Sequence, residues 1–160
     1  MVMAESSRTE SLVESPQGGW LRVAGRLLLV VVFLMAGIGH FIAADSFLGQ
    51  VPPLFPFRLP IVYVSGVIEL TFAAGLLLAG LRGGRHLPRL GWILAAFFVV
   101  IFPGNISQFV TGADAFGLDT DVRRFLRLLF QPVLVAWALW CTGAWSAWRT
   151  RLAGRSRVHR

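Results

Sequence analysis

The stretch YVSGVIELTFAAGLLLAG, residues 63–80, is apolar enough to lie in a membrane, yet it carries Glu69 near its middle. A helix needs about 20 predominantly apolar residues to cross the ~30 Å of hydrocarbon in a bilayer. A charged carboxylate at mid-membrane costs about 2.5–3.5 kcal/mol on insertion scales. The stretch therefore predicts a membrane-spanning helix, and Glu69 predicts a polar or cationic partner inside a helix bundle.

The whole chain has the composition of a membrane protein. Of its 160 residues, 56% are hydrophobic and 14% are charged, whereas a soluble domain carries about a quarter charged residues. All fifteen basic residues are arginines, and they flank apolar runs instead of forming a stripe with interleaved aromatic residues. Membrane orientation explains the net charge of +7, and we expect no nucleic-acid partner.

Four apolar segments predict an all-α fold, a bundle of four transmembrane helices. The segments run roughly from Val23 to Ala44, Leu59 to Leu81, Leu90 to Phe102 and Leu126 to Trp148. They are continuously apolar, and a helix satisfies its own backbone hydrogen bonds in hydrocarbon. The third segment spans only if its helix continues, kinked, past FPGN (residues 102–105) toward Phe109. Small residues such as Gly75 and Ala79 recur at helical spacing and would let helices approach closely.

The distribution of arginines predicts how the bundle is oriented in the plasma membrane. On the side of the chain ends lie Arg8, Arg22, Arg26, Arg82, Arg85, Arg89, Arg149, Arg151, Arg155, Arg157 and Arg160, and on the other side lie Arg58, Arg123, Arg124 and Arg127. Because arginine-rich segments stay in the cytoplasm, we expect both termini there. We divide the chain into a disordered cytoplasmic tail (residues 1–19), a membrane domain (residues 20–150) and a basic cytoplasmic tail (residues 151–160).

Polar side chains gather at one depth of the predicted bundle. At 1.5 Å of rise per residue, Glu69 lies about 13 Å below the outer surface. Ser65 precedes it by four residues and shares its helix face. Other polar residues of the outer half come from the remaining three helices. The candidates for an outward-facing pocket that binds a ligand or holds a proton are His40, Ser65, Glu69, Asn105, Arg127 and Gln131.

The charge of Glu69 needs a partner or a proton. Arg127 is the first candidate counter-ion and His40 the second. The alternative to a functional pocket is a buried ion pair or hydrogen-bond network that only sets the helix register. A second alternative for Arg127 is that its side chain reaches the interface by snorkelling. A haem in a membrane bundle commonly needs two histidine ligands, and the two histidines other than His40, namely His86 and His159, lie on the cytoplasmic side. We therefore expect no haem, no metal centre and no covalently bound cofactor. No catalytic constellation is readable.

The two outer loops differ in character. DSFLGQVPPLFPFRLP (residues 45–60) carries four prolines, which exclude a regular helix, and apolar residues that predict a loop on the membrane interface. The alternative for this loop is a lid over a cavity. TGADAFGLDTDVRR (residues 111–124) holds three aspartates whose spacing does not fit a calcium loop, so we predict a solvated acidic turn.

Five motifs together resemble a known family. In order they are AGIGHF (residues 36–41), the prolines of the first outer loop, YVSGVIEL (63–70), FPGNISQF (102–109) and RLLFQPVLVAWALW (127–140). Over roughly residues 22–148 the chain looks like the DoxX-like membrane proteins. The resemblance implies a compact four-helix membrane bundle. It places His40, Ser65, Glu69, Asn105 and Gln131 at positions that the family pattern marks, without assigning them a catalytic role.

The resemblance also implies a choice of functions. The family includes the small membrane subunit of a thiosulfate:quinone oxidoreductase, partners in maturation, and anchors of redox-defence complexes. We expect a membrane subunit or anchor of a redox-linked complex that is not catalytic alone, with a quinone as compatible ligand and an oxidoreductase or a second copy as partner. The alternatives are a membrane assembly or chaperone protein without a reaction, and a small transporter, which the nearly apolar inner half of the bundle disfavours.

Overall fold

The structure is a computed structural model that describes residues 16–158, with side chains described for residues 19–154. Most of the tail expected at residues 1–19 lies outside this range. The described residues form helices and no strands, which confirms the all-α prediction. The helices are α2 (Pro16–Ile42), α3 (Ala44–Leu48), α4 (Arg58–Leu81), α5 (Leu87–Thr111), α6 (Asp121–Cys141) and α7 (Ala144–Val158).

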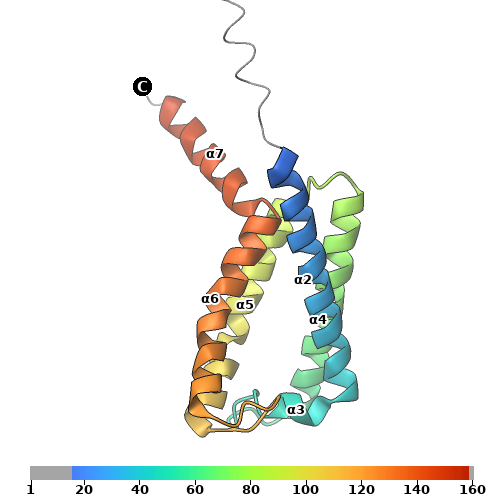
Figure 1. Cartoon of the computed structure of the whole chain (residues 1–160), viewed down its shortest axis with the longest axis vertical. Coiled ribbons are helices and arrows are strands. Elements are labelled where there is room, and N and C mark those ends of the chain that lie inside the picture. The colour runs from blue at the N-terminus through green and yellow to red at the C-terminus, as the bar shows by residue number, and fades with distance from the viewer. Residues whose placement is uncertain (1–15, 159–160) are drawn as a thin grey trace, which may run out of the picture.

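Four of these helices, namely α2 from Gly19 onward, α4, α5 and α6, are long and apolar enough to cross a membrane. They form the predicted bundle, and they mark the chain as a multi-pass membrane protein. The start of α2, the α4–α5 turn and α7 lie at one end of the bundle, which we name the termini end (Figure 1). The other end, with α3 and the segments 49–57 and 112–120, is the loop end.

The third spanning helix, α5, continues through Pro103 as the membrane length requires. The proline removes one backbone hydrogen bond, to the carbonyl of Val99. The other backbone groups still need partners in hydrocarbon, so the helix is the favoured conformation on both sides of the proline. It ends at Thr111, where Gly112 takes a left-handed conformation with φ of 66°. The expectation that this helix continues toward Phe109 is therefore confirmed.

The fourth apolar segment is not one helix from Leu126 to Trp148, and that prediction was wrong at both ends. Helix α6 begins five residues earlier, because the side chain of Thr120 caps it by accepting a hydrogen bond from the Arg123 backbone N–H. It ends at Cys141, and Gly143, with φ of 71°, turns the chain into α7. Helix α7 then continues to Val158, through the segment expected as a basic tail.

Helix α2 packs mainly on α4, and α5 packs mainly on α6. Two glycines set the α2–α4 crossing, because a Cβ atom on Gly66 would lie 2.7 Å from the His40 Cβ and 3.0 Å from the Gly37 carbonyl oxygen. The backbones can approach this closely only without side chains at both positions. At the termini end, the Trp137 indole N–H donates to the Gly25 carbonyl at 3.1 Å and joins α6 to α2.

The core of the termini half is apolar. It contains Leu29, Val30, Phe33, Ala73, Leu76, Leu87, Leu94, Phe98, Ala138 and Cys141. Phe33 stacks on Phe98 at 5.5 Å between ring centroids, and the Phe72 ring lies 5.6 Å away from it. These rings form an aromatic layer at the side of the core that faces the loop end. Such a layer offers a proton or a polar solute no stepping stone across the bundle.

The first outer loop divides into a buried and an exposed part. Phe47 and Val51 are buried, and together with Val62 they form a small apolar cluster at the loop end. Leu54 is 89% exposed and Phe57 is 70% exposed. Helix α3 packs on α4 and α2 at the loop end (Figure 1), and the outer part of the loop presents apolar side chains to its surroundings.

Candidate functional site

Buried polar side chains gather in the loop half of the bundle. They are His40, Glu69, Asn105, Gln108, Arg124 and Gln131, and they come from α2, α4, α5 and α6. Among the described residues, Thr142 is the one further buried polar side chain, and its hydroxyl donates to the Ala138 carbonyl of its own helix. These side chains therefore lie in one half of the bundle, as the sequence predicted.

His40 and Glu69 meet where α2 and α4 cross. Each lies one turn after a glycine of the crossing, Gly37 or Gly66, so the close backbones bring the two side chains together. The His40 Nδ1 atom lies 3.2 Å from Glu69 Oε2 and 2.7 Å from the Ala36 carbonyl oxygen. Of these two oxygens, the carbonyl oxygen is the nearer to Nδ1. Glu69 Oε2 is therefore within ion-pair range of His40 but accepts no hydrogen bond in the described structure.

Arg127 does not pair with Glu69, so our first choice of counter-ion was wrong. Helix α6, which carries Arg127, packs against α2, α5 and α7 and not against α4. The Arg127 Nε–H donates to Asn105 Oδ1 at 3.1 Å, and the guanidinium lies 5.6 Å from the centroid of the Phe116 ring. Residue spacing showed that Arg127 and Glu69 share a depth, but not that their helices are separated.

Asn105, Gln131 and Arg127 form a second group between α5 and α6. The Asn105 side-chain N–H donates to Gln131 Oε1 at 2.8 Å, and the Gln131 side-chain N–H donates to the Phe98 carbonyl. With the bond from Arg127 to Asn105, each of the three side chains has at least one partner. This group is satisfied internally, whereas the His40–Glu69 pair keeps a buried carboxylate oxygen without a donor.

Two phenylalanines connect the two polar groups. The Phe47 ring of α3 lies 3.7 Å from the His40 ring, and Phe116 of the second outer loop meets Phe47 edge-on at 4.6 Å, centroid to centroid. Phe116 then contacts Arg127 through a cation–π interaction. Its φ of 58° is unusual for a bulky residue. The loop thus holds Phe116 in a strained conformation that keeps the ring between the two groups.

Ser65 does not join either group in the described structure. It is half-buried on the same face as Glu69, one turn away, but no hydrogen bond of its hydroxyl is found among the described residues. Five of the six candidates are thus engaged, in a pair and a triad. Ser65 remains a neighbour of the pair without a contact of its own.

Arg124 and Gln108 are buried polar residues that we did not select from the sequence. Arg124 is only 7% exposed, and its guanidinium contacts Asp114 at 2.6 Å and Asp121 at 2.9 Å. The spacing of Asp121 and Arg124 could have predicted their ion pair, because residues three apart are neighbours on a helix. The acidic turn is therefore tied to α6. Within the described residues, no three metal-ligating side chains come together there or elsewhere.

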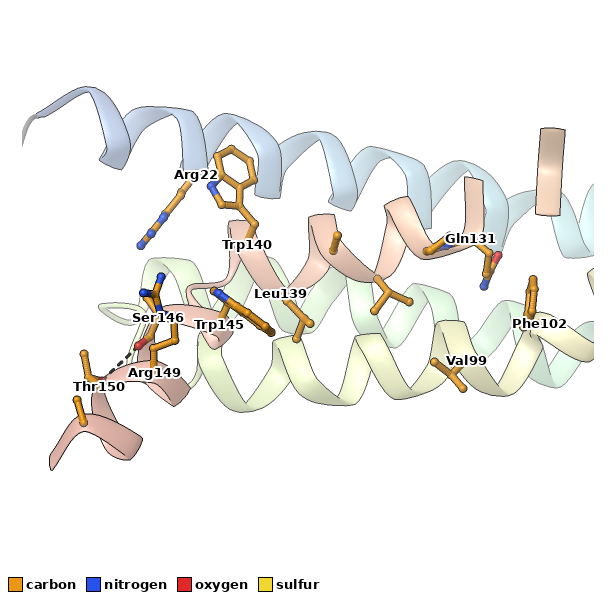
Figure 2. A pocket seen from close by; sticks show the side chains of 14 residues that line it. Arg22, Val99, Phe102, Gln131, Leu139, Trp140, Trp145, Ser146, Arg149 and Thr150 are labelled. Carbon is orange, nitrogen blue, oxygen red and sulfur yellow. Dashed lines mark hydrogen bonds between the residues drawn. The ribbon is translucent and has the colours of Figure 1, made fainter. Parts of the chain in front are cut away.

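A cavity of about 1130 Å³ lies on the flank of the bundle along α5, α6 and α7 (Figure 2). Among the six candidate residues, Gln131 alone lines this cavity. Most of its wall is apolar, and its far end reaches Arg22 and Arg149 at the termini end. It is therefore a different feature from the polar groups of the loop half.

The sequence model of a domain of unknown function, DUF8561, matches residues 29–142, which contain all six candidate residues and both polar groups. No curated protein and no solved structure matches the chain.

Proposed function

The chain belongs to the DUF8561 family, a domain of unknown function. From the motifs that resemble those of the DoxX-like proteins, we propose that it is a DoxX-like membrane subunit or anchor of a redox-linked complex in the plasma membrane. We propose further that the His40–Glu69 pair binds the polar head of a quinone-type ligand from the loop end. In this topology the termini are cytoplasmic and the loop end faces outward. Four of the five motifs that carry the resemblance to the DoxX-like proteins lie on α2, α4, α5 and α6, and the fifth is the proline-rich first outer loop. The arginine distribution supports the orientation.

One observation carries the proposal, namely the buried oxygen of Glu69 that accepts no hydrogen bond. Leaving a buried charged acceptor unsatisfied costs about 1–3 kcal/mol or more, so such a group in a native protein calls for a ligand, a proton or a water. A hydroquinone hydroxyl is a donor of the required kind. His40 lies 3.2 Å from this oxygen, within ion-pair range.

The surroundings of the pair fit an aromatic headgroup. Phe47 packs on the His40 ring, and Phe116 packs on Phe47. Flat rings prefer such offset and edge-on contacts. A quinone-type group would supply the electron chemistry when it is bound. The chain would orient the headgroup, exclude water with the two phenylalanines and hold a proton at Glu69 or His40.

A second candidate is an assembly protein without a reaction, and the Asn105–Gln131–Arg127 group favours it. The Asn105 and Gln131 side chains bond one another, the Arg127 Nε–H bonds Asn105, and the Phe98 carbonyl accepts from Gln131. Such a group joins α5 to α6 and specifies their register without needing a ligand. The quinone-binding subunit and the assembly protein differ in the role of Glu69, because only the quinone site requires its carboxylate oxygen to be free of a hydrogen bond.

The test combines a pull-down with two substitutions at Glu69. The tagged protein is extracted from its native membrane in mild detergent, and the co-purified polypeptides and quinones are identified. We expect an oxidoreductase subunit and a quinone with the natural chain. Glu69→Gln and Glu69→Leu should melt near the natural temperature but lose the quinone. Ser65→Ala, one turn away and without a hydrogen bond to remove, is the matched control and should retain it.

Two results would contradict the proposal. If the Glu69→Leu variant keeps its melting temperature, its quinone and its partner, Glu69 does not bind the quinone. A natural chain that purifies with a client protein but without a quinone or an oxidoreductase would favour the assembly function instead.

A further inference from the structure

A groove opens where α7 turns away from α6. The turn is made at Gly143, and α7 then leans away from the bundle axis (Figure 1). The space left between α7 and the α5–α6 pair is the cavity of about 1130 Å³. It runs from the termini end as far as Gln131, and neither His40 nor Glu69 lines it.

The apolar wall of the groove is as long as one leaflet of a bilayer. Along α6 it extends from Gln131 to Trp140 and includes Pro132, Val135 and Leu139. Nine residues at 1.5 Å each span about 14 Å. Half of the bilayer's hydrocarbon thickness is about 15 Å. A single hydrocarbon chain that starts at the interface of the termini end would therefore reach mid-membrane at Gln131.

The other end of the groove is positively charged. Arg22 of α2 and Arg149 of α7 are both exposed and both line it. Figure 2 shows their guanidinium groups directed into the same space, beside Ser146 and Thr150. Neither arginine forms an ion pair within the described residues. Like charges that converge in this way repel one another unless an anion lies between them.

The described part of the chain offers no carboxylate that could neutralise these arginines. Its acidic residues, Asp45, Glu69, Asp114, Asp119 and Asp121, lie in the loop half or at the loop end. A second copy that packed through the same face would add two more arginines to the mouth of the groove. The charge at this mouth therefore favours an anionic partner other than the chain itself.

We propose that the groove binds one anionic phospholipid from the leaflet at the termini end. The phosphate lies between Arg22 and Arg149, and one acyl chain lies along α6 toward Gln131. A free anion would explain the arginines but not an apolar wall of this length. A neutral lipid would explain the wall but not the convergent charges. Trp145, which also lines the groove, is 49% exposed and suited to the interface where the head group meets the acyl chain.

The experiment uses the full chain in mild detergent. Native mass spectrometry counts retained lipids, and the melting temperature is followed as phosphatidylglycerol, phosphatidylcholine or inorganic phosphate is added. We expect one retained phosphatidylglycerol, a higher melting temperature with it, a weaker effect of phosphatidylcholine and none of phosphate. A surface arginine contributes about fivefold in affinity for an anionic lipid, so Arg22→Gln with Arg149→Gln should weaken phosphatidylglycerol binding about thirtyfold.

Two further variants separate the charges from the wall. Arg82→Gln with Arg89→Gln removes the same charge at the same end, but neither residue lines the groove, so binding should stay within about twofold of the natural chain. Val99→Trp fills the groove from α5 and keeps both arginines. Val99 is exposed, so the fold tolerates the larger side chain while the acyl chain is excluded.

Four results would overturn the proposal. The first is equal retention of phosphatidylcholine and phosphatidylglycerol, and the second is equal loss in both double-arginine variants. The third is stabilisation by inorganic phosphate alone, which would assign the arginines to a small anion. The fourth is phosphatidylglycerol binding that appears only after residues 1–15 are removed. This result would indicate that Glu5, Glu10 and Glu14, and not a lipid, are the anionic partners of the arginines.

Discussion

Gly66→Ala should destabilise the bundle, because the new methyl group would lie inside the α2–α4 crossing. Its Cβ would be 2.7 Å from the His40 Cβ and 2.9 Å from the Phe41 ring. Carbon atoms pack best at about 3.5–4.0 Å, so the helices must separate by about 1 Å. The separation from His40 Nδ1 to Glu69 Oε2, now 3.2 Å, would lengthen by a similar amount and leave ion-pair range.

The magnitude can be isolated with a control on the same helix. At Gly75 an added Cβ would lie 3.5 Å from the nearest Leu90 carbon atom, which is an ordinary contact. Gly66→Ala and Gly75→Ala gain the same helix propensity, about 1 kcal/mol. The difference between the two variants therefore measures the overpacking alone, for which we expect about 1–3 kcal/mol.

The assay is reversible unfolding of each variant in mixed detergent micelles, followed by tryptophan fluorescence. Gly75→Ala should unfold at the same or a higher denaturant concentration than the natural chain, and Gly66→Ala at a lower one. If Gly66→Ala is as stable as Gly75→Ala, the two helices do not cross at Gly37 and Gly66, and the explanation of the His40–Glu69 contact fails with it.

Three further outcomes are expected. Gln131→Leu should lower the free energy of unfolding by about 1–2 kcal/mol, because the Asn105 N–H and the Phe98 carbonyl lose their partner; an unchanged melting temperature would show that the network is not formed. Phe116→Gly should be more stable than Phe116→Ala by about 1 kcal/mol, since both variants lose the ring but only glycine relieves the strain at φ of 58°. If Phe116→Ala is the more stable variant, the backbone at residue 116 is not strained. Cys141, which is 2% exposed, should react with maleimide in detergent only when the protein unfolds, so rapid labelling of the folded protein would contradict its burial.

Local properties of the chain were readable from the sequence. The four spanning helices follow from hydropathy, which a stretch such as residues 63–80 carries by itself. The depth of the polar residues follows from the rise per residue along each helix. His40, Glu69, Asn105 and Gln131 are accordingly buried in the loop half, as their positions along the four helices indicated.

Element ends depended on contacts that hydropathy does not register. Arg123 and Arg124 lower the apolarity of the first turns of α6, so hydropathy predicted a segment that begins at Leu126. In the structure, Thr120 caps the helix, and Asp121 with Asp114 neutralises Arg124. Likewise, the sequence stays apolar through Trp148, so hydropathy gave no sign of the turn at Gly143. That turn takes α7 out of the bundle and opens the groove.

The sequence by itself thus determined that this is a membrane bundle of four spanning helices with its polar residues in one half. Only the tertiary structure decided which polar residues are partners. Glu69 meets His40 and not Arg127, because two glycines let α2 and α4 touch while α4 and α6 remain apart. Depth is a property of one helix in a bilayer, whereas a contact depends on which helices are neighbours, and close packing between distant segments sets that choice.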